Sequence, residues 1–271
     1  MPHNHGESGF TLVELSIVLV IIGLLVGGVL VGKDLIKSAE IRSVIKDIET
    51  YRTAVNTFKL KYNCLAGDCP NATAYFGVQD PTPATCQITA SADMLTCDGN
   101  GNGKVDVGYE IFRFWQHLAN AGLIAGKFTG VVTSGGVSWR SSVGINCPKT
   151  AISDKVGFSF GYQDYSALTS VNAYSMNYGN MFWLGQESSG VTLGGAFTPT
   201  EALAIDQKID DGKPGKGYIL PRSITDAYAQ TNIPWGSANA CTTSVDYKDY
   251  DGDYKTSVDQ KVCSFFIKSG L

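Results

Sequence analysis

Side-chain oxygens alternate with glycines in one short stretch of the chain. Asp98, Asn100 and Asn102 occupy every second position, and Gly103 follows them. This order matches the first half of the calcium-loop pattern D-x-[DN]-x-[DN]-G, in which alternate oxygens surround one ion and the glycine allows a sharp bend. Tyr109 stands where the pattern has its bidentate Glu, so a Gly/Asn turn without an ion is the alternative. The predicted calcium ligands are Asp98, Asn100, Asn102, Lys104 (through its carbonyl), Asp106 and Glu110.

A second group of carboxylates lies near the end of the sequence. Asp249, Asp251 and Asp253 alternate, so they share one side of an extended chain. Like charges at that spacing repel unless water or a shared cation separates them. We therefore treat these three residues as a second, weaker candidate calcium site.

The seven cysteines all lie beyond residue 63, and no two of them form a C-x₂-C pair. This distribution favours disulfides in an oxidising compartment over a zinc site. The connectivity does not follow from the sequence alone. Pairing neighbours along the chain gives Cys64–Cys69, Cys86–Cys97 and Cys241–Cys263, and leaves Cys147 without a partner.

Catalytic signatures are scarce. The chain has no HExxH and no CxxCH motif, and His117 is its one histidine beyond residue 5. A general base needs partners that hold and use it, and none is evident around His117. We expect His117 to be packed or on the surface, and we expect no enzymatic activity.

Composition and charge describe a globular protein. The chain has 271 residues, of which 44% are apolar and 17% charged, enough for one sizeable globular head. The net charge of −4 is unevenly spread: residues 33–62 hold seven basic and four acidic groups (+3), and residues 63–271 hold 14 and 19 (−5). The head therefore offers no basic patch for nucleic acid.

The most apolar stretch, Phe10–Gly32, is 23 residues long and holds one charge, Glu14. About 20 apolar residues are enough for a helix to cross a bilayer, and a carboxylate inside such a segment calls for a partner. The alternatives are a secretory signal or a plain membrane anchor. A signal has a basic leader and a shorter apolar core, whereas residues 1–9 contain no Lys or Arg.

The string Gly9-Phe10-Thr11-Leu12-Val13-Glu14 resembles the leader of type IV pilins and type II secretion pseudopilins. The resemblance implies that a prepilin peptidase cleaves after Gly9 and methylates the amino group of Phe10. It also implies that Glu14 pairs with the N-terminus of a neighbouring subunit during assembly at an inner-membrane platform. The fold that it implies is α+β and pilin-like, with a leader (1–9), a transmembrane and spine helix (10–62) and a globular head (63–271).

Helical periodicity continues beyond the apolar stretch. Apolar residues spaced by three and four form one stripe, and no proline interrupts residues 10–62, so a single long helix is expected. The stripe consists of Val44, Ile48, Tyr51, Val55, Phe58 and Tyr62.

Three stretches of the head resemble a subgroup of large pilin-like proteins. They are the turn after the spine (residues 61–77), the run Trp115–Ile124 and the run Ile205–Gly217. We expect the turn to end the helix near Asn63. Alternation predicts strands at 156–162, 174–183 and 262–267, and Thr198-Pro199-Thr200-Glu201 predicts the start of a helix.

The sequence thus predicts a prepilin that is a single-pass inner-membrane protein before assembly, with its head outside the cytoplasm. Within this class the candidates are a pilus subunit, a type II secretion pseudopilin and a minor tip pilin with an adhesive role. The last would suit a large head. A membrane-tethered binding module or enzyme is the alternative from another class.

Overall fold

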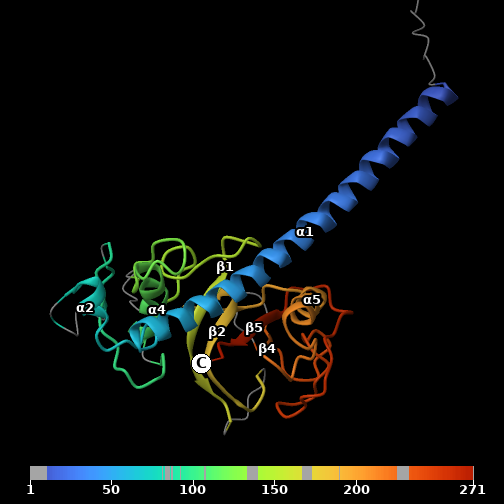
Figure 1. Ribbon diagram of the computed structural model, residues 1–271. Coiled ribbons are helices and arrows are strands. Elements are labelled where there is room, and N and C mark those ends of the chain that lie inside the picture. Colours follow the sequence, from blue (N-terminus) through green and yellow to red (C-terminus); the bar gives the residue numbers. More distant parts are fainter. Residues whose placement is uncertain are drawn as a thin grey trace, which may run out of the picture. The chain divides into compact units, whose positions relative to one another are not determined.

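The computed structural model describes residues 11–80, 82, 86, 88–91, 93–106, 108–132, 140–166, 173–188, 190–224 and 232–270. The chain forms two compact units, Met1–Arg42 and Ser43–Leu271, and we call the second the head unit. Helix α1 (Leu12–Tyr62, 51 residues) begins in the first unit and ends in the second. Figure 1 shows it as one continuous helix. The single long helix predicted from the sequence is confirmed.

The predicted apolar stripe is the face of α1 that the head unit covers. Val44, Ile48, Val55 and Phe58 are buried, and Tyr51 is half-buried with its ring edge-on to those of Trp115 and Phe158, at 4.9 and 5.1 Å between ring centroids. Aromatic contacts of this geometry stabilise beyond their buried area. The stripe therefore holds α1 against the rest of the head unit.

Helix α1 ends where the turn sequence predicts. Asn63 has a φ of 56°, the left-handed conformation that ends many helices and that asparagine adopts more readily than most residues. The next turn is closed by the Cys64–Cys69 disulfide and leads into α2 (Ala72–Phe76). The rings of Tyr75 and Phe76 then pack on Tyr62, so the new helix returns to the end of α1.

The sheet is antiparallel, and its strand order is not the order of the chain. Its strands are β1 (Val156–Asp164), β2 (Asn177–Ser188), β3 (Val191–Gly194), β4 (Ile219–Ser223) and β5 (Cys263–Lys268). They are arranged β1-β2-β5-β4, with β3 pairing on β2, so the last strand enters between β2 and β4. The predicted strands at 156–162, 174–183 and 262–267 are confirmed, the second beginning three residues late.

Both faces of the sheet are covered. On one face α4 (Gly108–Asn120) packs through Phe114, whose ring stacks on Phe160 of β1 at 3.7 Å. On the other face a second cluster gathers around β2 and β5. It consists of Ala173, Tyr174, Tyr178, Met181, Trp183, Leu220 and Phe266.

Helix α5 (Pro199–Ile209) begins at a capping box. Thr198 Oγ1 accepts from the Glu201 N–H, and Glu201 Oε2 accepts from the Thr198 N–H. These two bonds satisfy amides that the first helical turn leaves without partners. The helix start predicted at Thr198–Glu201 is confirmed.

The three disulfides pair the cysteines as neighbours along the chain, Cys64–Cys69, Cys86–Cys97 and Cys241–Cys263, which confirms the predicted set. Cys147 is buried and free, and burial raises the pKa of its thiol. A buried neutral thiol is a poor nucleophile and a poor metal ligand.

Candidate functional site

The first turn of α1 is closed by its own side chains. Glu14 Oε2 accepts from both the N–H and the Oγ1–H of Thr11, at 2.9 and 2.8 Å, and the Glu14 N–H donates to Thr11 Oγ1 at 3.2 Å. This reciprocal pair is a capping box with Glu14 at its third helical position. Glu14 Oε1 accepts no hydrogen bond from the described residues, so the carboxylate can still receive a cation. Gly9 and Phe10 lie outside the described residues.

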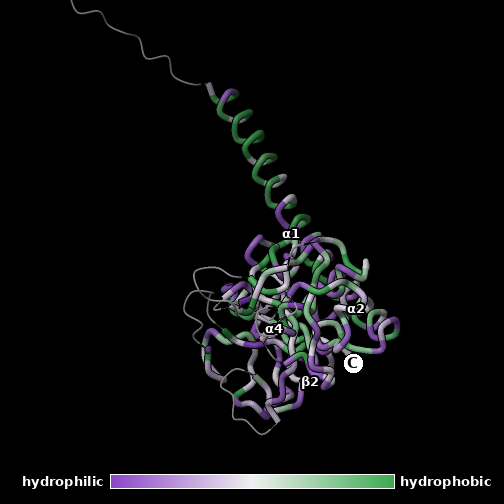
Figure 2. Tube along the Cα trace, turned by 90° about the vertical axis from the view of Figure 1, so that its left-hand side faces the viewer, coloured by the Kyte–Doolittle hydropathy of each residue, from purple (hydrophilic) through white to green (hydrophobic). Residues whose placement is uncertain are grey.

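Between that cap and Gly32, α1 is apolar on every side. This apolar part is long enough to cross a membrane, and none of it is buried within the protein. Figure 2 shows this part of the helix almost wholly in the hydrophobic colour. A helix that is hydrophobic all round and exposed needs a membrane or other apolar helices around it. This is consistent with a single-pass membrane anchor.

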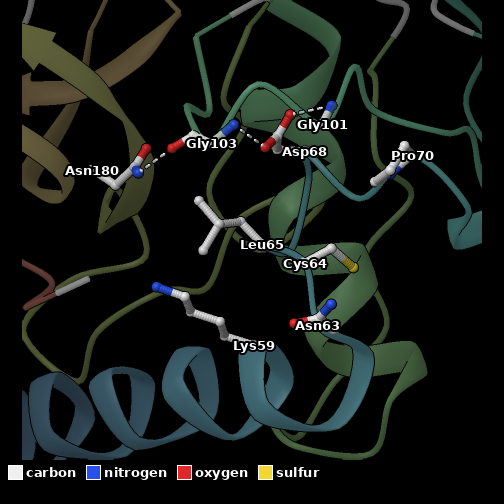
Figure 3. Close-up of a pocket in the computed structure, with 9 residues that line it drawn as sticks. All are labelled: Lys59, Asn63, Cys64, Leu65, Asp68, Pro70, Gly101, Gly103 and Asn180. Carbon is white, nitrogen blue, oxygen red and sulfur yellow. Dashed lines mark hydrogen bonds between the residues drawn. The ribbon is translucent and has the colours of Figure 1, made fainter.

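A pocket of about 340 Å³ lies in the head unit beside the last turn of α1. Figure 3 shows Lys59 reaching across it below Leu65, with Asp68 and Asn180 on its far side. The far wall is well ordered by hydrogen bonds, because Asn180 accepts from the Val105 N–H and donates to the Gly103 carbonyl. The remaining lining residues are Asn63, Cys64, Pro70, Gly101 and Gly103.

The glycine-rich loop turns its amides toward a buried carboxylate. Asp68 accepts from the N–H groups of Gly101, Asn102 and Gly103, at 2.7, 3.1 and 2.8 Å. Burial raises the pKa of Asp68, and these three bonds act in the opposite direction. Successive amides around an anion form a nest, so the loop supports the turn that follows α1. Asp68 was not among the predicted site residues.

Four of the six predicted calcium ligands in this region, Asp98, Asn100, Asn102 and Glu110, use side-chain oxygens in other hydrogen bonds. Asp98 accepts from the N–H and the hydroxyl of Thr73, at 2.8 and 2.9 Å, and Glu110 accepts from the Asn100 and Asp106 amides. The side chains of Asn100 and Asn102 accept from amides two residues further on. The ammonium of Lys104 lies over the ring of Tyr162. Calcium at this loop stays a prediction.

Lysines neutralise part of the second candidate site. Asp251 pairs with Lys216 and Asp253 with Lys213, at 2.5 and 2.6 Å, while Asp249 accepts from the Val245 N–H at 2.9 Å. The repulsion between the alternating carboxylates is therefore relieved by cations of the same chain. Calcium at Asp249, Asp251 and Asp253 also stays a prediction.

Among the described residues, the carboxylates that lie close enough to share an ion are those of Asp206, Asp210 and Asp211. Asp206 accepts from the Tyr254 hydroxyl and the Gly212 N–H, and burial raises its pKa to about 6. Asp210 accepts from the amides of Tyr218 and Ile219. These bonds describe a turn after α5 that its own acidic side chains stabilise.

The head unit also contains one hydrolase-like G-x-S-x-G string. Residues 157–161 read G-F-S-F-G, but they lie inside β1, and the hydroxyl of Ser159 donates to Ser141 Oγ at 2.8 Å. A nucleophilic serine of this motif needs a sharp turn from a strand to a helix. Ser159 is thus a buried strand residue.

A buried polar face of α4 was also missed. Glu110, Arg113, Gln116 and His117 are all fully buried, although their types and spacing resemble a solvated helix face. His117 Nδ1 accepts from the Gly67 N–H at 3.0 Å, and its Nε2 lies 2.8 Å from Thr96 Oγ1. Because Nδ1 accepts, Nε2 carries the proton and donates to Thr96. Of the two positions expected for His117, packed or on the surface, the structure shows the packed one.

Acid is expected to destabilise the head through His117. Burial, assisted by the charge of Arg113, lowers the pKa of His117 from 6.5 to about 3. The unfolded chain therefore takes up a proton near pH 6.5 that the folded chain refuses until about pH 3. The stabilisation that neutral His117 provides is complete above pH 6.5, and it falls by about 1.4 kcal/mol per pH unit between pH 6.5 and about pH 3.

This dependence can be isolated with His117→Asn, which offers an acceptor to Gly67 but does not titrate. Urea unfolding of the detergent-solubilised full chain at a series of pH values gives the free energy of unfolding for both proteins. The variant is expected to lose less free energy of unfolding than the wild type as the pH falls. Equal slopes would contradict the assignment of acid sensitivity to His117.

The comparisons with known proteins bear on the N-terminus. The family model for the prokaryotic N-terminal methylation motif matches residues 4–30. No curated protein and no solved structure matches the chain. The matched residues include the capping box of Thr11 and Glu14 and most of the exposed apolar part of α1. This motif and the helix that carries it give the chain the N-terminus of a prepilin of the type IV pilin and pseudopilin class.

Proposed function

We propose that the chain is a structural subunit of a type IV pilus-like filament, polymerised through the first half of α1 after residues 1–9 are removed. The observation that carries the proposal is the apolar, exposed stretch of α1 up to Gly32, whose single carboxylate, Glu14, lies in the first turn of the helix. Once cleavage creates an amino group on Phe10, that cation is the natural partner for a neighbour's Glu14. Burying the pair together costs less than burying either charge alone.

The subunit reaches the filament through the inner membrane. A prepilin peptidase processes the chain in the inner membrane, the head lies outside the cytoplasm, and an assembly platform moves the subunit into the filament. The apolar segments then pack around one another. Helices can approach closely at Gly23, Gly27, Gly28 and Gly32, because these residues have no side chain and a Cβ built there would meet open space.

Filaments sheared from cells that make the protein test this function. An abundant species whose mass begins at N-methylated Phe10 supports a main pilus subunit. The same mass in traces, or only in membranes, supports the alternatives within the class, a type II secretion pseudopilin or a minor tip pilin. A mature protein that retains Met1–Gly9 contradicts the proposal and favours a membrane-tethered module or enzyme.

A further inference from the structure

Two apolar side chains of the head unit stand out by their exposure. Leu60 is 87% exposed and Val245 is 69% exposed, the highest values among the large apolar residues that the structure describes after Arg42. An isolated exposed apolar residue is ordinary on a protein surface. These two differ because each lies next to charges, and the charges have opposite signs.

Leu60 lies on a basic surface. Lys59 and Lys61 flank it in the last turn of α1, and residues 50–67 contain no Asp or Glu. Lys59 forms no ion pair with any described residue and extends along the pocket of Figure 3, whose wall includes Leu65. This surface therefore combines an apolar centre with an ammonium group that lacks a counterion within the described part of the head unit.

Val245 lies on an acidic surface. The Asp249 carboxylate accepts from the Val245 N–H, and the Asp246 carboxylate accepts from the Lys248 N–H at 2.7 Å, so the turn has a defined shape. The neighbouring Asp251 and Asp253 have lysine partners. Asp246 and Asp249 form no ion pair with a described residue, and of these two Asp246 is the direct chain neighbour of Val245.

The two surfaces cannot meet within one chain. Figure 1 shows the last turn of α1 beside α2 and α4, whereas α5 lies toward the other end of the head unit. The segment with Val245 belongs with α5, since Asp253 pairs with Lys213 and Tyr254 bonds to Asp206. A contact between them joins two different patches on two copies, and such contacts repeat into open helical chains.

We propose that the Val245–Asp246 turn of one copy docks on the last turn of α1 in the next copy. Val245 then contacts Leu60, and Asp246 pairs with Lys59, which lines the pocket. This deepens the proposed function, on which it rests, by naming the contact between successive heads. Complementary charges mainly select the partner and its register, while like charges at the same place oppose binding.

Charge reversal tests the pairing in the full chain. Lys59→Glu and Asp246→Lys are each expected to reduce the chain recovered in filaments about tenfold, since a like-charge contact costs more than the pair contributes. Combining them restores opposite charges and is expected to recover most of the yield. Lys127→Glu and Asp259→Lys are matched controls at other exposed positions and leave the yield unchanged. A double variant no better than the single ones, with normal amounts in the membrane, overturns the pairing.

Cross-linking tests the contact separately from filament yield. One copy carries Leu60→Cys and a co-expressed copy carries Val245→Cys, and non-reducing gels of whole cells are compared with cells making either copy alone. A dimer specific to the mixture supports the docking. Filaments at the wild-type level without that dimer overturn the docking and leave the proposed function standing. The dimer in cells that make no filaments supports the docking and contradicts the proposed function. A dimer of Leu60→Cys alone overturns the docking in favour of a contact between two spines.

Discussion

Glu14→Gln is expected to reduce the chain recovered in filaments by about tenfold or more, while leaving processing between Gly9 and Phe10 intact. Glutamine has the shape of glutamate and can close the same capping box on Thr11, but it carries no charge. A neighbour's amino group would then be left in an apolar environment without a counterion, which costs several kcal/mol. The measurement is the amount of processed chain in sheared filaments relative to membranes.

Two further variants separate the charge from the helix cap. Thr11→Val removes the hydroxyl that both bonds to Glu14 and accepts from its amide, and it keeps the charge. Losing a cap costs about 1 kcal/mol, so Thr11→Val is expected to affect assembly far less than Glu14→Gln. Glu14→Ala loses the charge and the cap together and is expected to be at least as defective as Glu14→Gln. Filaments at the wild-type level from Glu14→Gln would exclude the docking role of Glu14.

Arg113→Met is expected to lower the free energy of unfolding of the full chain by about 3 kcal/mol or more. The guanidinium is fully buried and donates to Ser91, to Gln116 and to the carbonyl oxygens of Cys86 and Thr89. Methionine fills much of the same space but satisfies none of these acceptors, and each unsatisfied buried group costs about 1–3 kcal/mol. Arg113 thus holds the disulfide-bonded segment around residues 86–97 on α4.

Urea unfolding of the detergent-solubilised protein measures this loss. Lys127→Met removes a cation from an exposed position and is expected to change the free energy of unfolding by less than about 0.5 kcal/mol. Arg113→Lys keeps a charge but loses the planar fork that reaches several acceptors at once, so an intermediate loss is expected. If Arg113→Met unfolds at the same urea concentration as the wild type, the polar face of α4 does not stabilise the head.

Much of the fold could be predicted because its signals are local. A 3.6-residue period identifies the buried face of α1, since neighbours on a helix are fixed by its geometry. Alternation identifies β1 for the same reason. The string Gly9–Glu14 identified the class of the protein, because the cleavage of an N-terminus and its insertion into a membrane depend on consecutive residues.

The contacts between distant segments could not be predicted in this way. No short stretch of sequence predicts that β5 lies between β2 and β4. Strand order depends on which strand edges are free to pair in the folded chain. The acidic residues illustrate the same limit. Alternation drew attention to Asp251 and Asp253, but Lys213 and Lys216, distant in sequence, neutralise them in space.

The sequence by itself therefore determined the class of the protein and its long helix, both of which depend on residues close together in the chain. Which cysteines pair was decided by the structure, which confirmed the pairing of neighbours. The tertiary structure alone decided that the face of α4 with Arg113 and His117 is buried and that the glycine loop surrounds Asp68. The physical reason is that a polar side chain is buried only when distant segments supply its partners, and those partners become neighbours only in the folded chain.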